Sequence, residues 1–158
     1  MDTSHTTQPT RYQAAVSSLT KIGITLKPYQ VAGINWMFNL EAQDSGGILA
    51  DDPGLGKTLQ ALSLVASSPS DNTTLLVVPT TLIPQWKELV QQLFGTHSVY
   101  VHHGTRDHTK FPMTRVVITT YGIVRKDVVL ANKRFHRIIL DEGHEIKNKG
   151  TKLSLIHI

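Results

Sequence analysis

One short segment constrains this chain more than any other part of its sequence. It runs from Ile48 to Thr58 and reads Ile-Leu-Ala-Asp-Asp-Pro-Gly-Leu-Gly-Lys-Thr, so a short apolar strand enters a glycine-containing loop and then a helix. Glycines allow several backbone N–H groups to point at one phosphate, and the helix N-terminus adds its dipole. In such a loop Lys57 reaches the β- and γ-phosphates and the Thr58 hydroxyl ligates Mg²⁺. The segment predicts a phosphate-binding loop. The alternative is an ordinary strand–helix turn, because Asp51 replaces the first glycine of the pattern G-x-x-x-x-G-K-[ST].

An acidic pair supplies a second part of such a site. Asp141 and Glu142 directly follow the apolar run 137–140. A nucleotide hydrolase needs a carboxylate that holds Mg²⁺ and a group that acts on the attacking water. Ligands gather at the carboxyl edge of a parallel sheet, where this pair is expected. Alone, the pair is equally consistent with a helix cap. Together with the upstream loop, it favours a site in which Asp141 holds the metal and Glu142 acts on water.

Short apolar runs alternate with helical patterns along the chain. The runs are apolar throughout, as in strands buried on both faces, and the alternation predicts a three-layer α/β fold with a mostly parallel sheet. The runs cover 47–50, 75–78, 116–119 and 137–140, with a weaker one at 98–101, and the helical patterns cover 34–40, 58–67 and 84–94. Segment 123–133 has no clear pattern.

Composition excludes several classes of protein. The chain has 158 residues and no cysteine, which excludes disulfide scaffolds, thiolate zinc sites and cysteine nucleophiles. No apolar run reaches the roughly 18–20 residues of a membrane span. Residues 1–104 hold five basic and seven acidic groups (net −2), whereas residues 105–158 hold eleven and five (net +6). The basic half indicates either a polyanionic partner such as nucleic acid or a solvated basic face.

Five segments, in one order, resemble the first RecA-like lobe of helicase superfamily 2, in its SWI/SNF-like branch of DNA-dependent ATPases. Residues 26–37 resemble the Q motif, 51–58 motif I, 77–88 motif Ia, 118–121 motif Ib and 141–148 motif II. The D-E-G-H spelling of motif II, followed by Ile-Lys-Asn, is typical of this branch. An aspartate at position 51 is also normal for it. Asp52-Pro53 replaces the usual Glu-Met, and Pro53 removes one N–H donor.

The resemblance implies ATP and Mg²⁺ as cofactors and assigns roles to single residues. Gln30 is expected to bind the adenine edge, and the phosphates are expected on Asp51, Pro53, Gly54, Leu55, Gly56, Lys57 and Thr58. Thr58 and Asp141 would hold Mg²⁺, with Lys57, Asp141 and Glu142 as the catalytic set. His144 would couple this site to the DNA-binding motifs. Thr80, Thr81 and Thr120 would contact the phosphate backbone of DNA, most simply a duplex, without reading bases.

Other chemically suggestive residues have simpler interpretations. Trp86 is expected to pack in the core. His102, His103 and His108 are expected in a surface turn, because no acidic residue or cysteine stands at a convincing metal-binding spacing. Lys133, Arg134 and Arg137 are expected at a solvated or DNA-facing edge.

The predicted organisation is a flexible lead-in (1–18), an incomplete first RecA-like P-loop lobe (19–152) and a non-native tail (153–158). The tail reads Leu-Ser-Leu-Ile-His-Ile, the translation of the transposase end sequence CTG TCT CTT ATA CAC ATC used in library adapters. The resemblance implies a second RecA-like lobe that donates arginine fingers, which are worth about 10³–10⁵ in rate in phosphoryl transfer. The chain alone is therefore expected to be nearly inactive.

The function implied by the resemblance is ATP hydrolysis coupled to translocation on DNA, in chromatin remodelling or DNA repair. Two alternatives remain: a strand-separating superfamily 2 helicase, and a degenerate, non-catalytic nucleic-acid-binding lobe. No membrane association is expected. The nucleus is the expected location in a eukaryote, and the cytoplasm otherwise.

Overall fold

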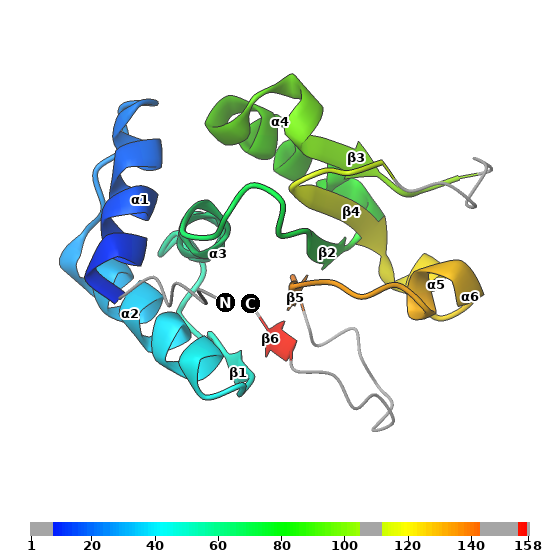
Figure 1. Cartoon of the computed structure of the whole chain (residues 1–158), viewed down its shortest axis with the longest axis horizontal. Helices are drawn as coiled ribbons and strands as arrows, with labels where there is room; N and C mark the ends of the chain where they lie inside the picture. Colours follow the sequence, from blue (N-terminus) through cyan, green and yellow to red (C-terminus); the bar gives the residue numbers. More distant parts are fainter. Residues whose placement is uncertain (1–7, 105–111, 143–154, 158) are drawn as a thin grey trace, which may run out of the picture.

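Six parallel strands form the centre of the part of the chain that the structure describes. The computed structural model describes residues 8–104, 112–142 and 155–157 (Figure 1). The strand order is β1-β6-β5-β2-β4-β3, and every neighbouring pair is parallel. The strands are β1 (Gly47–Ile48), β2 (Thr74–Val78), β3 (Val99–Val101), β4 (Val116–Thr120), β5 (Arg137–Leu140) and β6 (Leu155–His157).

Helices cover both faces of this sheet, so the fold has the three layers that the apolar runs predict. Helices α1 to α4 lie on one face, and the short helices α5 and α6 lie on the other (Figure 1). The helices are α1 (Gln8–Thr20), α2 (Pro28–Ala42), α3 (Lys57–Ala66), α4 (Ile83–Phe94), α5 (Tyr121–Val124) and α6 (Val128–Ala131), with 3-10 turns η1 (Thr80–Leu82) and η2 (Thr96–Ser98).

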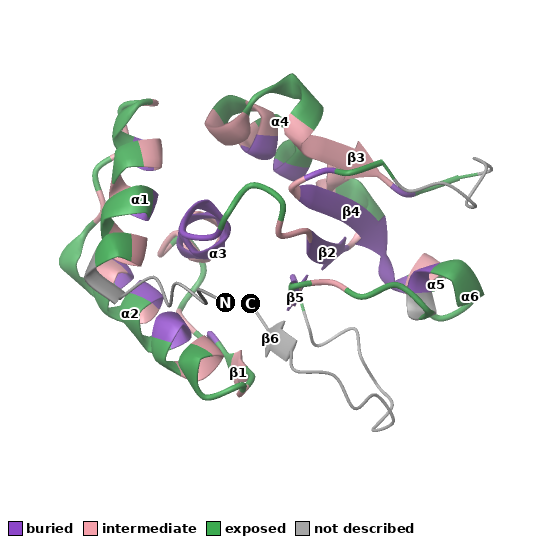
Figure 2. Ribbon diagram, viewed as in Figure 1, coloured by how far each residue is buried: buried purple, intermediate pink, exposed green. Residues whose placement is uncertain are grey.

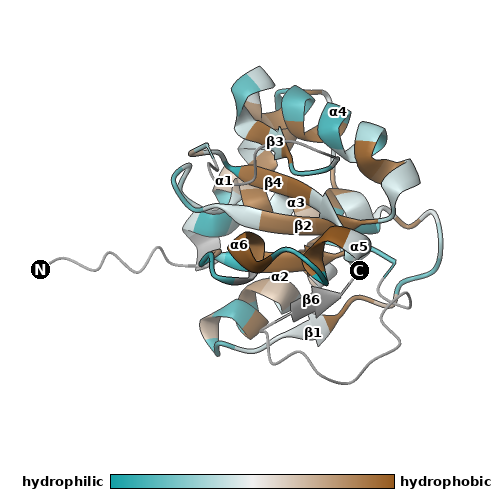
Figure 3. Cartoon of the chain, turned by 90° about the vertical axis from the view of Figure 1, so that its right-hand side faces the viewer, coloured by the Kyte–Doolittle hydropathy of each residue, from teal (hydrophilic) through white to brown (hydrophobic). Residues whose placement is uncertain are grey.

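Alternation along the strands creates two apolar cores. In β2, Leu76 and Val78 pack with α2, α3 and α4, whereas Leu75 and Val77 pack with α5 and α6. Successive side chains of a strand point to opposite faces, so a strand buried on both sides must be apolar at every position. All five residues of β2 are buried, as Figure 2 shows. Hydrophobic residues likewise concentrate in the central strands, and hydrophilic ones lie on the outer turns of α4 (Figure 3).

The two ends of the chain differ from the sequence-based expectation in local structure. Residues 8–20 form α1, whose Ala15 and Leu19 are buried, where a flexible lead-in was expected. Polar residues around these two positions, such as Gln13, Ser17 and Ser18, hide this helical spacing. At the other end, Leu155–His157 form β6 between β1 and β5. The proposal of a non-native tail rests on the sequence alone.

Candidate functional site

The glycine-containing loop connects β1 to α3. Gly54 and Gly56 have φ angles of 83° and 78°, in the left-handed region that favours glycine. Gly56 is also the residue that precedes the first turn of α3, and no side chain caps that turn. The backbone N–H groups of a helix's first turn have no partner within the helix and attract anions. The loop and the start of α3 therefore form a cradle suited to a phosphate.

Lys57 lies at the centre of this cradle. Its Nζ donates to the carbonyl oxygens of Asp51 at 2.7 Å and Asp52 at 3.2 Å, so the loop wraps around the ammonium group. The Asp51 side chain is held in turn, because Gln60 Nε2 donates to its Oδ2 at 3.0 Å. The aspartate that replaces the first glycine of the common pattern thus anchors the loop to α3.

Gln60 is a site residue that the sequence analysis missed. It is fully buried, and a Cβ added at Gly33 would lie 2.0 Å from its Oε1, so α2 approaches α3 closely here. Its signal in the sequence is a polar residue at a position of α3 surrounded by buried neighbours. Buried amides need hydrogen-bond partners, and Asp51 supplies one.

Gln30 joins the first turn of α2 to the same loop. Its Oε1 accepts from the Lys27 backbone N–H at 2.9 Å, and its Nε2 donates to the Leu55 carbonyl at 3.2 Å. A Cβ at Gly56 would lie 2.4 Å from Gln30 Nε2, so the contact requires glycine there. Gln30 therefore lies against the loop, and its role toward adenine remains a prediction.

Asp141 follows β5 and is buried, with 9% of its surface exposed. Its Oδ2 accepts from Trp86 Nε1 at 2.7 Å, its carbonyl accepts from the Tyr121 hydroxyl at 2.6 Å, and its N–H donates to the Val77 carbonyl at 2.9 Å. Burial raises the pKa of the Asp141 carboxyl. The Trp86 hydrogen bond and the Lys57 charge lower it, but the pKa stays above its ordinary value. The loop follows β1 and Asp141 follows β5 of the same parallel sheet, so both lie at its carboxyl edge.

Glu142 has an unusual backbone. Its φ is 54°, in the left-handed region that a non-glycine residue rarely adopts, and its side chain is exposed. Such strain costs on the order of 1–3 kcal/mol and clusters at functional sites. The charge of Glu142 also raises the pKa of Asp141, so the two carboxylates are close enough to repel. A solvent-facing carboxylate beside a buried one suits a division between acting on water and holding a metal.

The three threonines predicted to contact nucleic acid lie at the same edge of the sheet. Thr80 and Thr81 are exposed in η1, directly after β2. Thr120 is buried at the end of β4, where it lies opposite Val78 of β2 in parallel register. Parallel strands end at a common edge, so all three threonines share the edge that carries Asp141. His144 lies outside the described residues.

Trp86 is a core residue, as expected, with 2% of its surface exposed, but it also donates to Asp141. The second function was missed because Trp86 and Asp141 are 55 positions apart. Tyr121 was missed for the same reason.

The surface-turn interpretation is wrong for His102. This histidine is fully buried, and its ring Nε2 lies 2.7 Å from Asp127 Oδ2. The partner follows 25 positions later, beyond β4, so local spacing could not reveal it. His103 is exposed, and His108 lies outside the described residues. In the described ranges, no three histidine, aspartate or glutamate side chains gather as a metal site would require.

The solvated-edge interpretation is also wrong for Arg137. Its guanidinium is buried and donates to Glu41 Oε1 at 2.6 Å, Glu41 Oε2 at 3.2 Å and Ser68 Oγ at 2.6 Å. Arg11 pairs with the same carboxylate. Burial raises the pKa of Glu41, but the two arginines hold it below its ordinary value overall. Lys133 and Arg134 are exposed.

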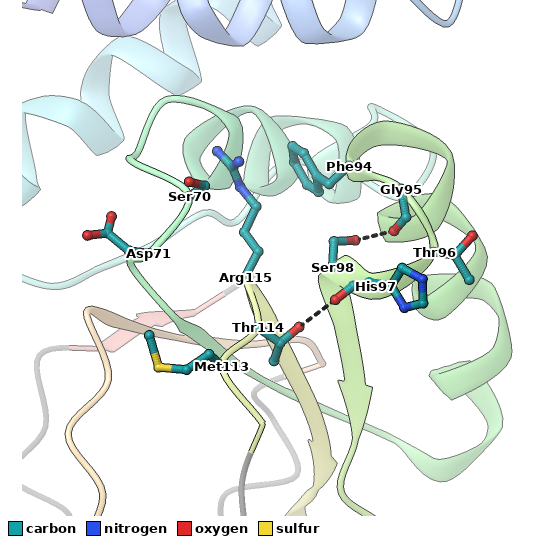
Figure 4. A pocket seen from close by; sticks show the side chains of 10 residues that line it. All are labelled: Ser70, Asp71, Phe94, Gly95, Thr96, His97, Ser98, Met113, Thr114 and Arg115. Atoms are coloured by element: carbon teal, nitrogen blue, oxygen red, sulfur yellow. Dashed lines mark hydrogen bonds between the residues drawn. The ribbon is translucent and has the colours of Figure 1, made fainter.

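A cavity of about 370 Å³ lies near the start of β3 and β4, away from the loop and the acidic pair (Figure 4). Arg115 in its wall donates to the carbonyls of Val65, Ala66 and Ser68 at 2.7–3.2 Å and lies over the Phe94 ring. This arginine thus stabilises the C-terminal end of α3, where a positive charge is favourable.

The residues present fit ATP and Mg²⁺. A cradle of left-handed glycines, an uncapped helix start and a central ammonium suit a polyphosphate. The Thr58 hydroxyl and the Asp141 carboxylate offer the hard oxygen ligands that Mg²⁺ prefers. These features define the class of the protein: a P-loop nucleotide-binding lobe of RecA-like architecture.

The chain belongs to the family of SNF2-related domains, which it matches over residues 29–158. It is 33% identical over 155 residues to Protein CHROMATIN REMODELING 24 of Arabidopsis thaliana, covering 84% of this chain and 14% of that protein. It is 37% identical over 150 residues to DNA repair protein RAD5 of Candida albicans, covering 68% of this chain and 14% of that protein.

A solved structure shows the same fold. The SWI2/SNF2 ATPase core of Sulfolobus solfataricus in complex with dsDNA superposes with a TM-score of 0.73 at 29% identity. The match covers 85% of this chain and 30% of that one. The chain thus spans a small part of the length of its relatives. None of the helices in the described ranges combines the length and apolar character of a membrane span.

Proposed function

We propose that this chain is the first nucleotide-binding lobe of a DNA-dependent ATPase that moves along duplex DNA in chromatin remodelling or DNA repair. The observation that supports the proposal is that the loop of Lys57 follows β1 and the buried Asp141 follows β5, so both lie at the carboxyl edge of one parallel sheet. Thr80, Thr81 and Thr120 lie at that same edge, so the proposed nucleotide and DNA contacts would adjoin. In a eukaryotic cell the nucleus is the corresponding location.

Within the site, the roles follow from exposure and charge. Lys57 and the first-turn N–H groups of α3 would bind the phosphates, and Thr58 and Asp141 would hold Mg²⁺. When bound, the metal neutralises charge on the phosphate oxygens. Glu142, exposed beside Asp141, would orient the attacking water and accept its proton. Gln30, fixed between α2 and the loop, would face the adenine.

The same proposal includes a second RecA-like lobe in the whole protein. The small coverage of the relatives supports it. That lobe would supply the arginine that stabilises charge developing during phosphoryl transfer. The chain alone should therefore bind Mg²⁺·ATP weakly and hydrolyse it slowly.

Calorimetric titration of the chain with Mg²⁺·ATP tests the phosphate loop. Lys57→Ala should weaken binding at least about tenfold, since a charge-assisted contact of about 1.5–3 kcal/mol is removed. Lys87→Ala is the matched control, because Lys87 is an exposed lysine of α4. Equal affinities of the two variants would refute the assignment of the loop.

Glu142→Gln tests the assignment of the water-activating residue. In the protein that includes the second lobe, it should retain Mg²⁺·ATP binding and lose DNA-stimulated turnover, since the amide cannot accept a proton. Asp71→Asn, at an exposed position ahead of β2 and outside the motif segments, should retain both. Normal turnover of Glu142→Gln would exclude Glu142 from this role.

A further inference from the structure

Two buried donors from two different segments converge on Asp141. Trp86 lies in the first turns of α4, which follows η1 directly, and its Nε1 donates to the carboxylate at 2.7 Å. Tyr121 is the first residue of α5, and its hydroxyl donates to the Asp141 carbonyl at 2.6 Å. One donor thus holds the side chain of Asp141, and the other holds its backbone.

We propose that Trp86 is a positioning residue for Asp141, whose indole N–H fixes the carboxylate in the orientation that receives Mg²⁺. The inference rests on the proposed function, in which Asp141 is a metal ligand. A metal-binding carboxylate commonly depends on such an outer hydrogen bond for its orientation, and loss of the bond typically costs 10–100-fold in metal affinity or activity.

The surroundings of Trp86 make the indole a rigid support. Its ring packs in the core beside fully buried residues, including Val90 one turn further along α4. Core packing alone would be served by any large apolar side chain. The N–H aimed at a buried carboxylate is the feature that a phenylalanine lacks. Without this donor, the buried carboxylate would lose the hydrogen bond that compensates for the free-energy cost of its removal from water.

The arrangement also links the candidate DNA contacts to the metal site. Thr80 and Thr81 precede α4 in η1, and Thr120 immediately precedes Tyr121. Trp86 therefore connects α4, directly after η1, to the Asp141 carboxylate, and Tyr121 connects the end of β4 to the Asp141 backbone.

A spectroscopic experiment tests the inference without relying on activity. The chain has two tryptophans, so Trp36→Phe leaves Trp86 as the sole tryptophan, whose emission can be excited selectively over that of the tyrosines. Addition of MgCl₂ in the presence of ATP should change its emission, because the acceptor of the indole N–H changes its charge environment. Asp141→Asn in the same background should abolish the change. Unchanged emission under conditions where calorimetry shows Mg²⁺·ATP binding would overturn the proposal.

Trp86→Phe tests the consequence for the metal. The Mg²⁺ concentration for half-maximal nucleotide binding should rise about tenfold or more. Val90→Ala is the control, since it creates a cavity in the same core on the same helix and removes no donor. Its Mg²⁺ dependence should match the parent protein, and an equal change in both variants would reduce Trp86 to a packing role.

The failure of this inference is distinguishable from that of the proposed function. If Lys57→Ala and Asp141→Asn weaken Mg²⁺·ATP binding and Trp86→Phe does not, only the positioning role of Trp86 is refuted. If none of the three variants changes the affinity for Mg²⁺·ATP, the assignment of the site is refuted, and so is the positioning role that depends on it.

Discussion

Replacement of Arg137 by methionine should destabilise the chain more than any surface change. Arg137 has 6% of its surface exposed and makes two hydrogen bonds to the Glu41 carboxylate, one to Ser68 and a longer one, of 3.4 Å, to Thr74. Methionine fills a similar volume without donors, so Glu41 would keep its burial and lose its main counter-charge. Arg11 would remain as a second partner of the carboxylate.

The expected magnitude follows from these contacts. Removal of one partner from a buried ion pair costs about 3–5 kcal/mol. Because Arg11 stays in place, the lower end, about 3 kcal/mol, is expected for Arg137→Met. In a domain of this size 1 kcal/mol shifts Tm by about 2–4 °C, so Tm should fall by about 6–12 °C. The double variant Arg137→Met/Glu41→Leu should recover part of this loss, since no buried carboxylate is left without its main counter-charge, while the partly exposed Arg11 keeps its contacts with Ser67 and the Phe38 ring.

Thermal unfolding followed by circular dichroism, across a range of pH, is the assay. The pKa of Glu41 lies below its ordinary value of 4.5, so its ion pairs contribute stability above that pH, and the contribution is lost as pH falls through the lowered value. The gap in Tm between parent and Arg137→Met should therefore narrow on acidification. Arg134→Met, at an exposed position, is the control. A fall of less than about 2 °C for Arg137→Met at neutral pH would refute the reasoning.

Two further substitutions test other parts of the structure. Gly56→Ala combines a left-handed φ with a Cβ 2.4 Å from Gln30 Nε2, so its free energy of unfolding should fall by more than backbone strain alone, which is about 1–2 kcal/mol. Gly54→Ala has a left-handed φ but open space around the added Cβ, so its free energy of unfolding should fall by the backbone strain alone. Urea unfolding measures both, and equal losses would contradict the contact with Gln30. Asp127→Ala removes both the helix cap of α6 and the partner of His102, and should cost about 1–2 kcal/mol at neutral pH in the same assay. The Leu130 N–H and the His102 contact lower the pKa of Asp127, so this loss should shrink as pH falls through the lowered value, and a loss that grows would contradict it.

The central strands and the two halves of the site were predictable because their chemistry is local. A strand covered by helices on both faces must be apolar at each position, and 75–78 and 116–119 satisfy this without reference to any other segment. The loop of Lys57 and the pair at Asp141 are likewise recognisable from short stretches. Their meeting at one edge follows from parallel strand order.

The contacts that support the site were not predictable, because they depend on pairs far apart in sequence. The sequence does not show whether a charged side chain is exposed or buried, so Arg137 was predicted at the surface. Its partner Glu41 stands 96 positions away, and only the folded structure brings the two together. His102 was predicted in a surface turn because its partner, Asp127, is distant in sequence and lies beside its ring only in the folded chain. Trp86 was correctly predicted to lie in the core, but the acceptor of its indole N–H, Asp141, is identified only in the folded chain.

The side chain of Lys57 also supports the loop in which it stands. Both carbonyl oxygens that accept from its ammonium belong to that loop, so the lysine braces two consecutive backbone positions ahead of α3. Replacement of Lys57 would therefore remove a positive charge and, at the same time, a brace of the loop's curvature.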